Sequence, residues 1–198
     1  MKPNQLVFVW DGVVRLFHWA TVLLCMLNFF VVKEGGRYHR YIGYTLAGLL
    51  LIRIIWGFVG GHYARFGQWW PTPTRVKSYL AALKRGEHPY YLGHNPGGSL
   101  MILIMLVGLI GTVVTGLMTR YESIFGDDLL EEIHGLFANG LQFAILIHVL
   151  AVVFTDLLTK GDLIRAMVTG CKRVPEETLC QDVKPDAPSK ANIDNSNK

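Results

Sequence analysis

Apolar residues gather into four long runs along the chain, and the segments between them are polar or rich in glycine and proline. The runs cover residues 13–32, 41–60, 98–119 and 134–158. A helix needs roughly 20 apolar residues to cross about 30 Å of hydrocarbon, so each run predicts one transmembrane helix. The first run is too long for the apolar core of a secretory signal and has no small-residue cleavage site, so we expect it to remain as a span.

The segment between the second and third runs contains a further helical pattern, in residues 73–85. Apolar side chains recur there at helical spacing, namely Val76, Tyr79, Leu80 and Leu83. Basic residues occupy the other positions, which is typical of a short amphipathic helix in the headgroup layer. Trp69 and Trp70 precede this helix and are expected at the same interface.

These patterns predict an all-α fold, an integral membrane four-helix bundle with one short interfacial helix. The bundle is expected within residues 1–172. The remaining residues, 173–198, are polar and contain three prolines. Such a segment buries too little apolar surface to offset the entropy lost on ordering, so we expect a disordered tail.

Composition and charge also favour a membrane protein. Only 17% of the residues are charged and 51% are hydrophobic, whereas about 25% are charged in soluble domains. Basic residues concentrate near both termini and between the second and third spans, so the positive-inside rule places both termini in the cytoplasm. The same bias accounts for the net charge of +4, and no nucleic-acid partner is expected.

Two of the seven histidines lie on the fourth span, His134 and His148, fourteen positions apart. That spacing is about 40° short of four full turns and roughly 21 Å along a helix. One helix therefore presents two imidazoles on one face at two depths. An ionisable side chain inside a span is costly, which makes each of these histidines a candidate functional residue.

Two further histidines lie at matching depths on other spans. His39 opens the second span at the outer face, level with His134. His18 precedes the outer end of the first span by fourteen positions, so its depth is that of His148. The predicted pairs are His39 with His134 and His18 with His148. An iron held by two imidazoles has no open position for a substrate, which suits electron transfer, so we expect two haems in the bundle core.

Other interpretations of these histidines remain open. A single histidine in a span as often hydrogen-bonds a neighbouring backbone carbonyl. A zinc site needs three or four nearby ligands, whereas the two pairs are far apart and lack thiolates. The chain's three cysteines form no Cys-x-x-Cys-His motif, which excludes covalent haem attachment.

Two arginines are candidate partners for the haem propionates. Arg53 lies inside the second span, where a guanidinium needs an anionic partner. The alternative is that Arg53 extends to the inner headgroups. Arg15 is an equal candidate for the propionate. His94, in a Gly- and Pro-rich segment, is interpreted as part of a tight turn, with a quinone or partner contact as the alternative.

Several segments resemble the bacterial cytochrome b561 family and the b-type cytochrome subunit of nickel–iron hydrogenases. They are VWD at residues 9–11, RLFHW at 15–19, YLGHNP at 91–96, the His134-to-His148 spacing and LIRAMVTG at 163–170. That spacing is also found in the cytochrome subunit of membrane formate dehydrogenase. The resemblance implies a four-helix bundle with two b haems, ligands that carry over to the four paired histidines, and exchange with the quinone pool.

The leading functional hypothesis is a diheme b-type cytochrome that carries electrons across the inner membrane between the quinone pool and a partner redox protein. That partner is expected to be a periplasmic or membrane protein, either a cytochrome c or a dehydrogenase subunit. A stand-alone superoxide:quinone oxidoreductase of the same fold is the first alternative. A haem-free membrane transporter or assembly factor is the second. No residue is assigned a catalytic role.

Overall fold

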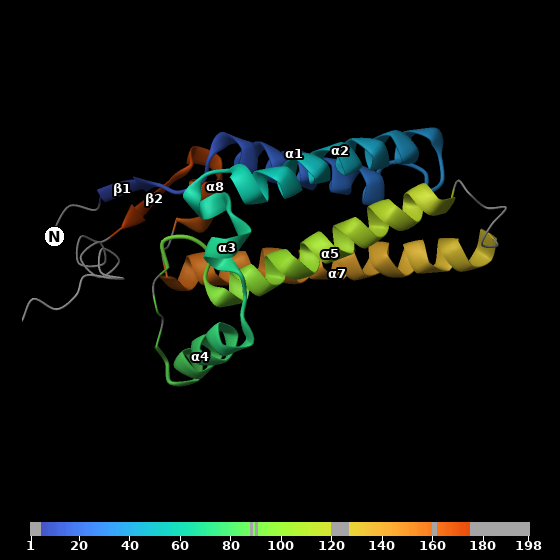
Figure 1. Cartoon of the computed structure of the whole chain (residues 1–198). Helices are drawn as coiled ribbons and strands as arrows, with labels where there is room; N and C mark the ends of the chain where they lie inside the picture. The colour runs from blue at the N-terminus through green and yellow to red at the C-terminus, as the bar shows by residue number, and fades with distance from the viewer. Residues whose placement is uncertain (1–4, 88, 90, 120–126, 160–161, 175–198) are drawn as a thin grey trace, which may run out of the picture.

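The structure, a computed structural model, describes residues 5–87, 89, 91–119, 127–159 and 162–174. Its frame is four long helices: α1 (Gly12–Phe30), α2 (Arg37–Val59), α5 (Pro96–Met118) and α7 (Asp127–Thr159). All four are long and apolar enough to cross a membrane, which confirms the four predicted spans. Helix α5 packs along α7, α1 packs along α2, and α2 also contacts α5 (Figure 1).

The helices begin where the sequence offers caps. Asp11 accepts a hydrogen bond from the Val14 amide at 2.9 Å and so caps α1. Asn95 caps α5 in the same way through the Gly98 amide at 2.7 Å, and Pro96 fits the first helical position because that position needs no amide donor. Helix α7 begins at Asp127, earlier than hydropathy indicated, because acidic residues are favourable in a first turn.

One end of the bundle, which we call the sheet end, is closed by small elements. Strand β1 (Gln5–Phe8) pairs antiparallel with β2 (Cys171–Val174). Beside them lie the 3₁₀ turn η1 (His62–Ala64), α3 (Phe66–Trp69) and α8 (Leu163–Thr169). The Gly170 carbonyl accepts hydrogen bonds from the Val9 amide at 2.8 Å and the Trp10 amide at 3.1 Å. The two segments that flank the bundle are therefore joined at this end (Figure 1).

This sheet adds two strands to the expected all-α fold. It also draws Arg173 and Val174 into β2, although both belong to the expected tail. The rest of that tail lies outside the described residues. The opposite end, which we call the loop end, carries the connection from α1 to α2 and the beginning of α7.

Helix α4 (Pro73–Lys84) is the short helix expected from the amphipathic pattern, and Thr72 caps it. It lies beside the start of α5 at the sheet end (Figure 1). The two preceding tryptophans separate. Trp70 is 49% exposed as an interfacial residue would be, whereas Trp69 is only 4% exposed. The Trp69 indole is turned inward beside the rings of Phe66 and His94, so only Trp70 presents its ring at the surface.

Two clusters of buried side chains hold the bundle together. The first, at the sheet end, comprises Val9, Trp10, Val14, Ala64 and Ala166. The second lies between the four long helices and comprises Cys25, Leu46, Leu50, Leu109 and Leu141. On α2 the buried positions Leu46, Leu50 and Arg53 share the helix face of His39, so this face of α2 points into the bundle.

Candidate functional site

His39 and His134 meet at the loop end, and we call them the loop-end pair. His39 lies in the first turn of α2, and His134 lies near the start of α7. Their ring centroids are 6.1 Å apart and their planes are 80° to each other. A metal–imidazole nitrogen bond is about 2 Å long, so two imidazoles on opposite sides of one metal place their ring centres about 6 Å apart. The loop-end pair has that spacing.

His18 of α1 and His148 of α7 form the sheet-end pair. The two imidazoles are near enough to interact electrostatically. The ring of Trp19 stands edge-on beside His18, with centroids 5.0 Å apart. Since α7 is one continuous helix across both histidines, the two pairs lie at levels roughly 21 Å apart along it. The structure thus brings together each of the two predicted combinations.

Several buried polar atoms around these pairs have no hydrogen-bond partner among the described residues. They are Nδ1 of His18, Nδ1 of His39, Nη1 of Arg53 and Nε of Arg15. Buried polar groups are nearly always paired, since an unpaired one costs about 1–3 kcal/mol. Imidazoles that come together in pairs, with unpaired guanidinium nitrogens at the sheet end, fit a bound group that carries a metal ion and carboxylates.

Arg53 is enclosed at the sheet end. Its exposed fraction is 5%, and Nη2 donates a hydrogen bond to the Ala64 carbonyl at 3.3 Å. The guanidinium carbon lies 5.0 Å from the centre of the Phe66 ring. Elements η1 and α3 therefore cover Arg53, and the guanidinium is held inside the protein, not extended into a headgroup layer.

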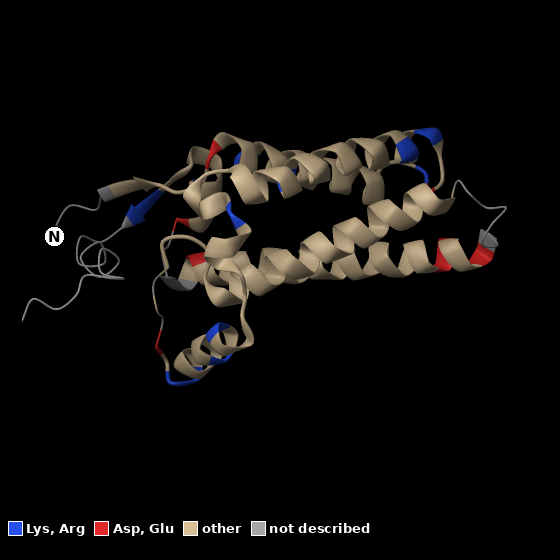
Figure 2. Ribbon diagram, in the orientation of Figure 1, with Lys and Arg blue, Asp and Glu red and all other residues tan. Residues whose placement is uncertain are grey.

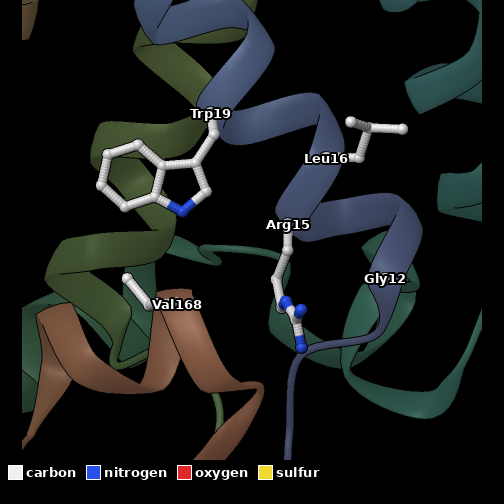
Figure 3. Close-up of a pocket in the computed structure, with 5 residues that line it drawn as sticks. All are labelled: Gly12, Arg15, Leu16, Trp19 and Val168. Carbon is white, nitrogen blue, oxygen red and sulfur yellow. The ribbon is translucent and has the colours of Figure 1, made fainter.

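Arg15 occupies a different setting, a pocket between α1 and α8 (Figure 3). Gly12, Leu16 and Trp19 of α1 and Val168 of α8 form the rest of its lining. The Trp19 indole donates a hydrogen bond to the Met167 carbonyl at 3.2 Å, which joins the two helices. A Cβ on Gly170 would lie 2.7 Å from Nη1 of Arg15, so the guanidinium reaches the turn that links α8 to β2.

His94 is half-buried at the sheet end, against the rings of Trp10 and Trp69 at centroid distances of 4.4 and 5.6 Å. Burial lowers its pKa to about 3, and the positive charges of Arg53 and Lys172 act in the same direction. The imidazole is therefore neutral at physiological pH. His94 lies in the connection just before α5, and no local sequence pattern indicated that its ring would pack between two tryptophans.

Lys172 of β2 is a second buried ionisable group at this end, with an exposed fraction of 6%. Its Nζ donates a hydrogen bond to the Tyr91 carbonyl at 2.7 Å. Burial lowers its pKa to about 8. Lys172 thus ties β2 to the segment before α5.

No group of three or more His, Cys, Asp or Glu side chains in the described part of the chain is placed to hold a metal ion. Within those residues the histidines are arranged as pairs, not as part of a zinc-type ligand set.

Sequence reasoning missed Thr115 of α5, whose hydroxyl oxygen lies 3.1 Å from Nδ1 of His134. A threonine within an apolar span carries no local signal of such a contact, and Thr112 and Thr119 are equally plausible by sequence. Only the packing of α5 on α7 distinguishes them. Gly116 beside Thr115 was a usable signal, because a glycine within a span marks a close approach of another group.

Two pairs of imidazoles inside four spanning helices suit a membrane b-type cytochrome, which binds haem b and transfers electrons. The chain belongs to the prokaryotic cytochrome b561 family, whose sequence pattern matches residues 9–170. The protein is thus a multi-pass membrane cytochrome.

Relatives with assigned names cover most of the chain. A probable Ni/Fe-hydrogenase B-type cytochrome subunit of Azotobacter vinelandii is 27% identical over 89% of this chain and 92% of its own. Its counterpart in Azotobacter chroococcum is 26% identical over the same shares. A probable Ni/Fe-hydrogenase 1 B-type cytochrome subunit of Escherichia coli is 31% identical over 45% of this chain and 49% of its own. No solved structure matches the chain.

Proposed function

We propose that this protein is a diheme cytochrome that carries electrons across the bacterial inner membrane between the quinone pool and a partner redox protein. One haem b is held by the loop-end pair, His39 and His134, and the other by the sheet-end pair, His18 and His148. The observation that carries the proposal is the 6.1 Å separation of the His39 and His134 ring centroids. Two packed imidazoles have no other evident reason to face each other inside an apolar bundle.

Haem b would supply an iron that accepts and releases one electron, and the two imidazoles of each pair would hold it without leaving room for a substrate. The protein's contribution is to hold the imidazoles at two levels on the rigid helix α7. The apolar cluster of Cys25, Leu46, Leu50, Leu109 and Leu141 lies between the helices and excludes water from the bundle centre. This arrangement favours electron transfer over catalysis at either iron.

Arg53 is the stronger candidate for a propionate partner at the sheet end. It is buried, it lies on the bundle-facing side of α2, and its Nη1 has no partner among the described residues. A carboxylate there would satisfy the free donor and compensate the buried charge. Arg15 has a free Nε as well, but its guanidinium lies beside the α8–β2 turn, in the pocket that α1 and α8 form (Figure 3).

The distribution of charge supports an orientation with the sheet end, and hence both termini, in the cytoplasm. Basic residues lie on α4, on β2 and near the start of α1 (Figure 2). This bias is that of the cytoplasmic side of a membrane protein.

The loop end carries basic and acidic residues in separate places. Basic residues lie where α1 connects to α2, and acidic residues lie at the start of α7 (Figure 2). Such a mixed surface does not concentrate a small anion such as superoxide, so nothing in it favours the stand-alone oxidoreductase. Relatives of matching length are named as hydrogenase cytochrome subunits, and we propose that the partner is likewise a dehydrogenase subunit at the membrane.

The test is a reduced-minus-oxidised spectrum of the purified full chain, with haem quantified per polypeptide. We expect two b haems in the unchanged protein and one in each of His18→Ala, His39→Ala, His134→Ala and His148→Ala. Members of one pair should lose the same spectral component. His62→Ala is the matched control, since His62 is exposed in η1, and it should retain both haems. Fewer than two haems in the unchanged protein would refute the diheme proposal.

The electron path is tested with the same protein in lipid nanodiscs. A quinol should reduce the haems of the unchanged protein, and addition of the oxidised quinone should reoxidise them. If the haems exchange electrons with neither the quinol nor the quinone, the quinone pool is not the electron partner.

A further inference from the structure

Thr115 links α5 to an imidazole of the loop-end pair. Its Oγ1 lies 3.1 Å from Nδ1 of His134. The same oxygen lies 2.7 Å from the Gly111 carbonyl and 3.2 Å from the Thr112 carbonyl. Thr115 is also buried, with an exposed fraction of 8%, so these contacts are shielded from water.

The hydroxyl has a single hydrogen, and the neighbouring carbonyls decide where it points. A carbonyl oxygen can only accept, so the short contact with Gly111 requires that the Thr115 hydroxyl donate to it. The hydroxyl oxygen then accepts from His134, whose Nδ1 must carry the hydrogen. That leaves Nε2 of His134 as the nitrogen with a free lone pair, which is the form a metal ligand needs.

The backbone beside Thr115 also fixes where the imidazole lies. A Cβ on Gly116 would lie 3.0 Å from Cε1 and 3.3 Å from Nδ1 of His134. The glycine therefore lets the ring rest directly against α5. One turn earlier, Gly111 provides the room that the Phe137 ring fills. Contacts on α5 thus define both the position of the His134 ring and its tautomer.

Among the described residues, Nδ1 of His39 and Nδ1 of His18 have no comparable partner. Only one ligand of the loop-end pair is therefore coupled to a protein acceptor. We propose that Thr115 is a positioning residue: its hydroxyl fixes the tautomer and orientation of His134 and lowers the electron affinity of the loop-end haem. This inference rests on the proposed ligation of that haem by His39 and His134.

The direction of the hydrogen bond decides whether the midpoint potential of the loop-end haem rises or falls when the hydroxyl is removed. An imidazole that donates through Nδ1 becomes a more basic ligand, and a more basic ligand stabilises the oxidised iron. Removal of the hydroxyl should therefore raise the midpoint potential of the loop-end haem and leave the sheet-end haem unchanged.

The experiment is a redox titration of Thr115→Val, followed separately for the two spectral components. At the midpoint potential of the unchanged protein, the ratio of oxidised to reduced loop-end haem should fall about two- to tenfold, the range for loss of one hydrogen bond. Thr115→Ser keeps the hydroxyl and should restore the original midpoint. Thr112→Val is the matched control, because the Thr112 hydroxyl donates only to the Gly108 carbonyl, and it should change neither haem.

Thr115→Ala provides a second test if the valine variant does not fold, since it removes the hydroxyl without adding a methyl group. An unchanged loop-end midpoint in a folded hydroxyl-free variant would overturn the inference. An equal shift in Thr115→Ser or in Thr112→Val would do the same. If the protein holds two haems but the loop-end midpoint does not shift, only the role of Thr115 is rejected. Fewer than two haems in the unchanged protein would instead reject the proposed function.

Discussion

Arg53 and Phe66 enclose each other at the sheet end. The guanidinium carbon of Arg53 lies 5.0 Å from the centre of the Phe66 ring, and Gly57, one turn further along α2, leaves the space that this ring occupies. A guanidinium over an aromatic ring is stabilised by a cation–π interaction. Helix α3 is thereby fixed on α2, and a positive charge is kept inside the protein within electrostatic range of His94, at the same end of the bundle as the sheet-end pair.

This enclosed charge should control the proposed sheet-end haem. A nearby positive charge favours the reduced state, so Arg53→Leu should lower the midpoint potential of that haem on the order of 50 mV or reduce its occupancy. The loop-end haem should be unchanged. A redox titration with haem quantified per chain measures both effects.

Two further arginines serve as comparisons. Arg65 donates to the Gly60 carbonyl at 2.8 Å on the surface of the same region, so Arg65→Leu should leave both potentials unchanged. Arg15→Leu should have a smaller effect than Arg53→Leu. A larger effect of Arg15→Leu would indicate that the propionate binds in the pocket between α1 and α8 instead.

Gly111 should tolerate no side chain. A Cβ at this position would overlap the ring of Phe137, so Gly111→Ala would force α5 and α7 apart or displace that ring. Overpacking of this kind costs about 1–3 kcal/mol, and the thermal unfolding midpoint in detergent should fall. Gly140→Ala is the control, because nothing lies within 4 Å of its added Cβ. Equal midpoints for the two variants would contradict the close packing of α5 on α7.

Lys172 should make stability depend on alkaline pH. Burial lowers its pKa from 10.5 to about 8, so between these values the unfolded chain binds more protons than the folded protein. The free energy of unfolding should therefore rise with pH across this window, by about 1 kcal/mol per pH unit, and stay level with respect to this group below pH 8. Thermal unfolding at several pH values measures the slope, which Lys172→Met should abolish. If the slope persists in Lys172→Met, another titrating group must cause the pH dependence.

Asp11 should contribute more to the free energy of unfolding than an ordinary helix cap does. One carboxylate oxygen caps α1 through Val14, and the other accepts a hydrogen bond from the Trp56 indole at 3.0 Å. Asp11→Ala removes both and should lower the free energy of unfolding by about 2 kcal/mol. Thr72→Ala removes only the cap of α4 and should cost about half as much, by the same unfolding measurement. Equal losses of stability in Asp11→Ala and Thr72→Ala would show that the contact with Trp56 does not stabilise the fold.

The spans were predictable because hydrocarbon imposes a strong, local requirement on about 20 successive residues. Fixed helical geometry then sufficed to bring His18 near His148 and His39 near His134. The start of α7 was missed because Asp128, Glu131 and Glu132 are charged, and hydropathy alone cannot separate a charged first turn from a loop.

The sheet end was not predictable from local patterns. Strands of four residues carry little periodicity, and β1 pairs with a segment at the other end of the described chain. Trp69 is buried, and His94 is partly covered, only because elements distant in sequence pack on them. Whether Arg53 would point outward or inward was also left open by the sequence, since η1 and α3 decide it by tertiary contact.

The pairing of β1 with β2 has a consequence for biosynthesis. Residues 5–8 cannot find their partners until the ribosome has delivered the chain through Val174, when all four spans have already entered the bilayer. Closure of the sheet end is therefore a late event in maturation, and its long sequence separation makes it slow. Until then the hydrogen bonds from the Val9 and Trp10 amides to the Gly170 carbonyl cannot form, so the two segments that flank the bundle are joined last.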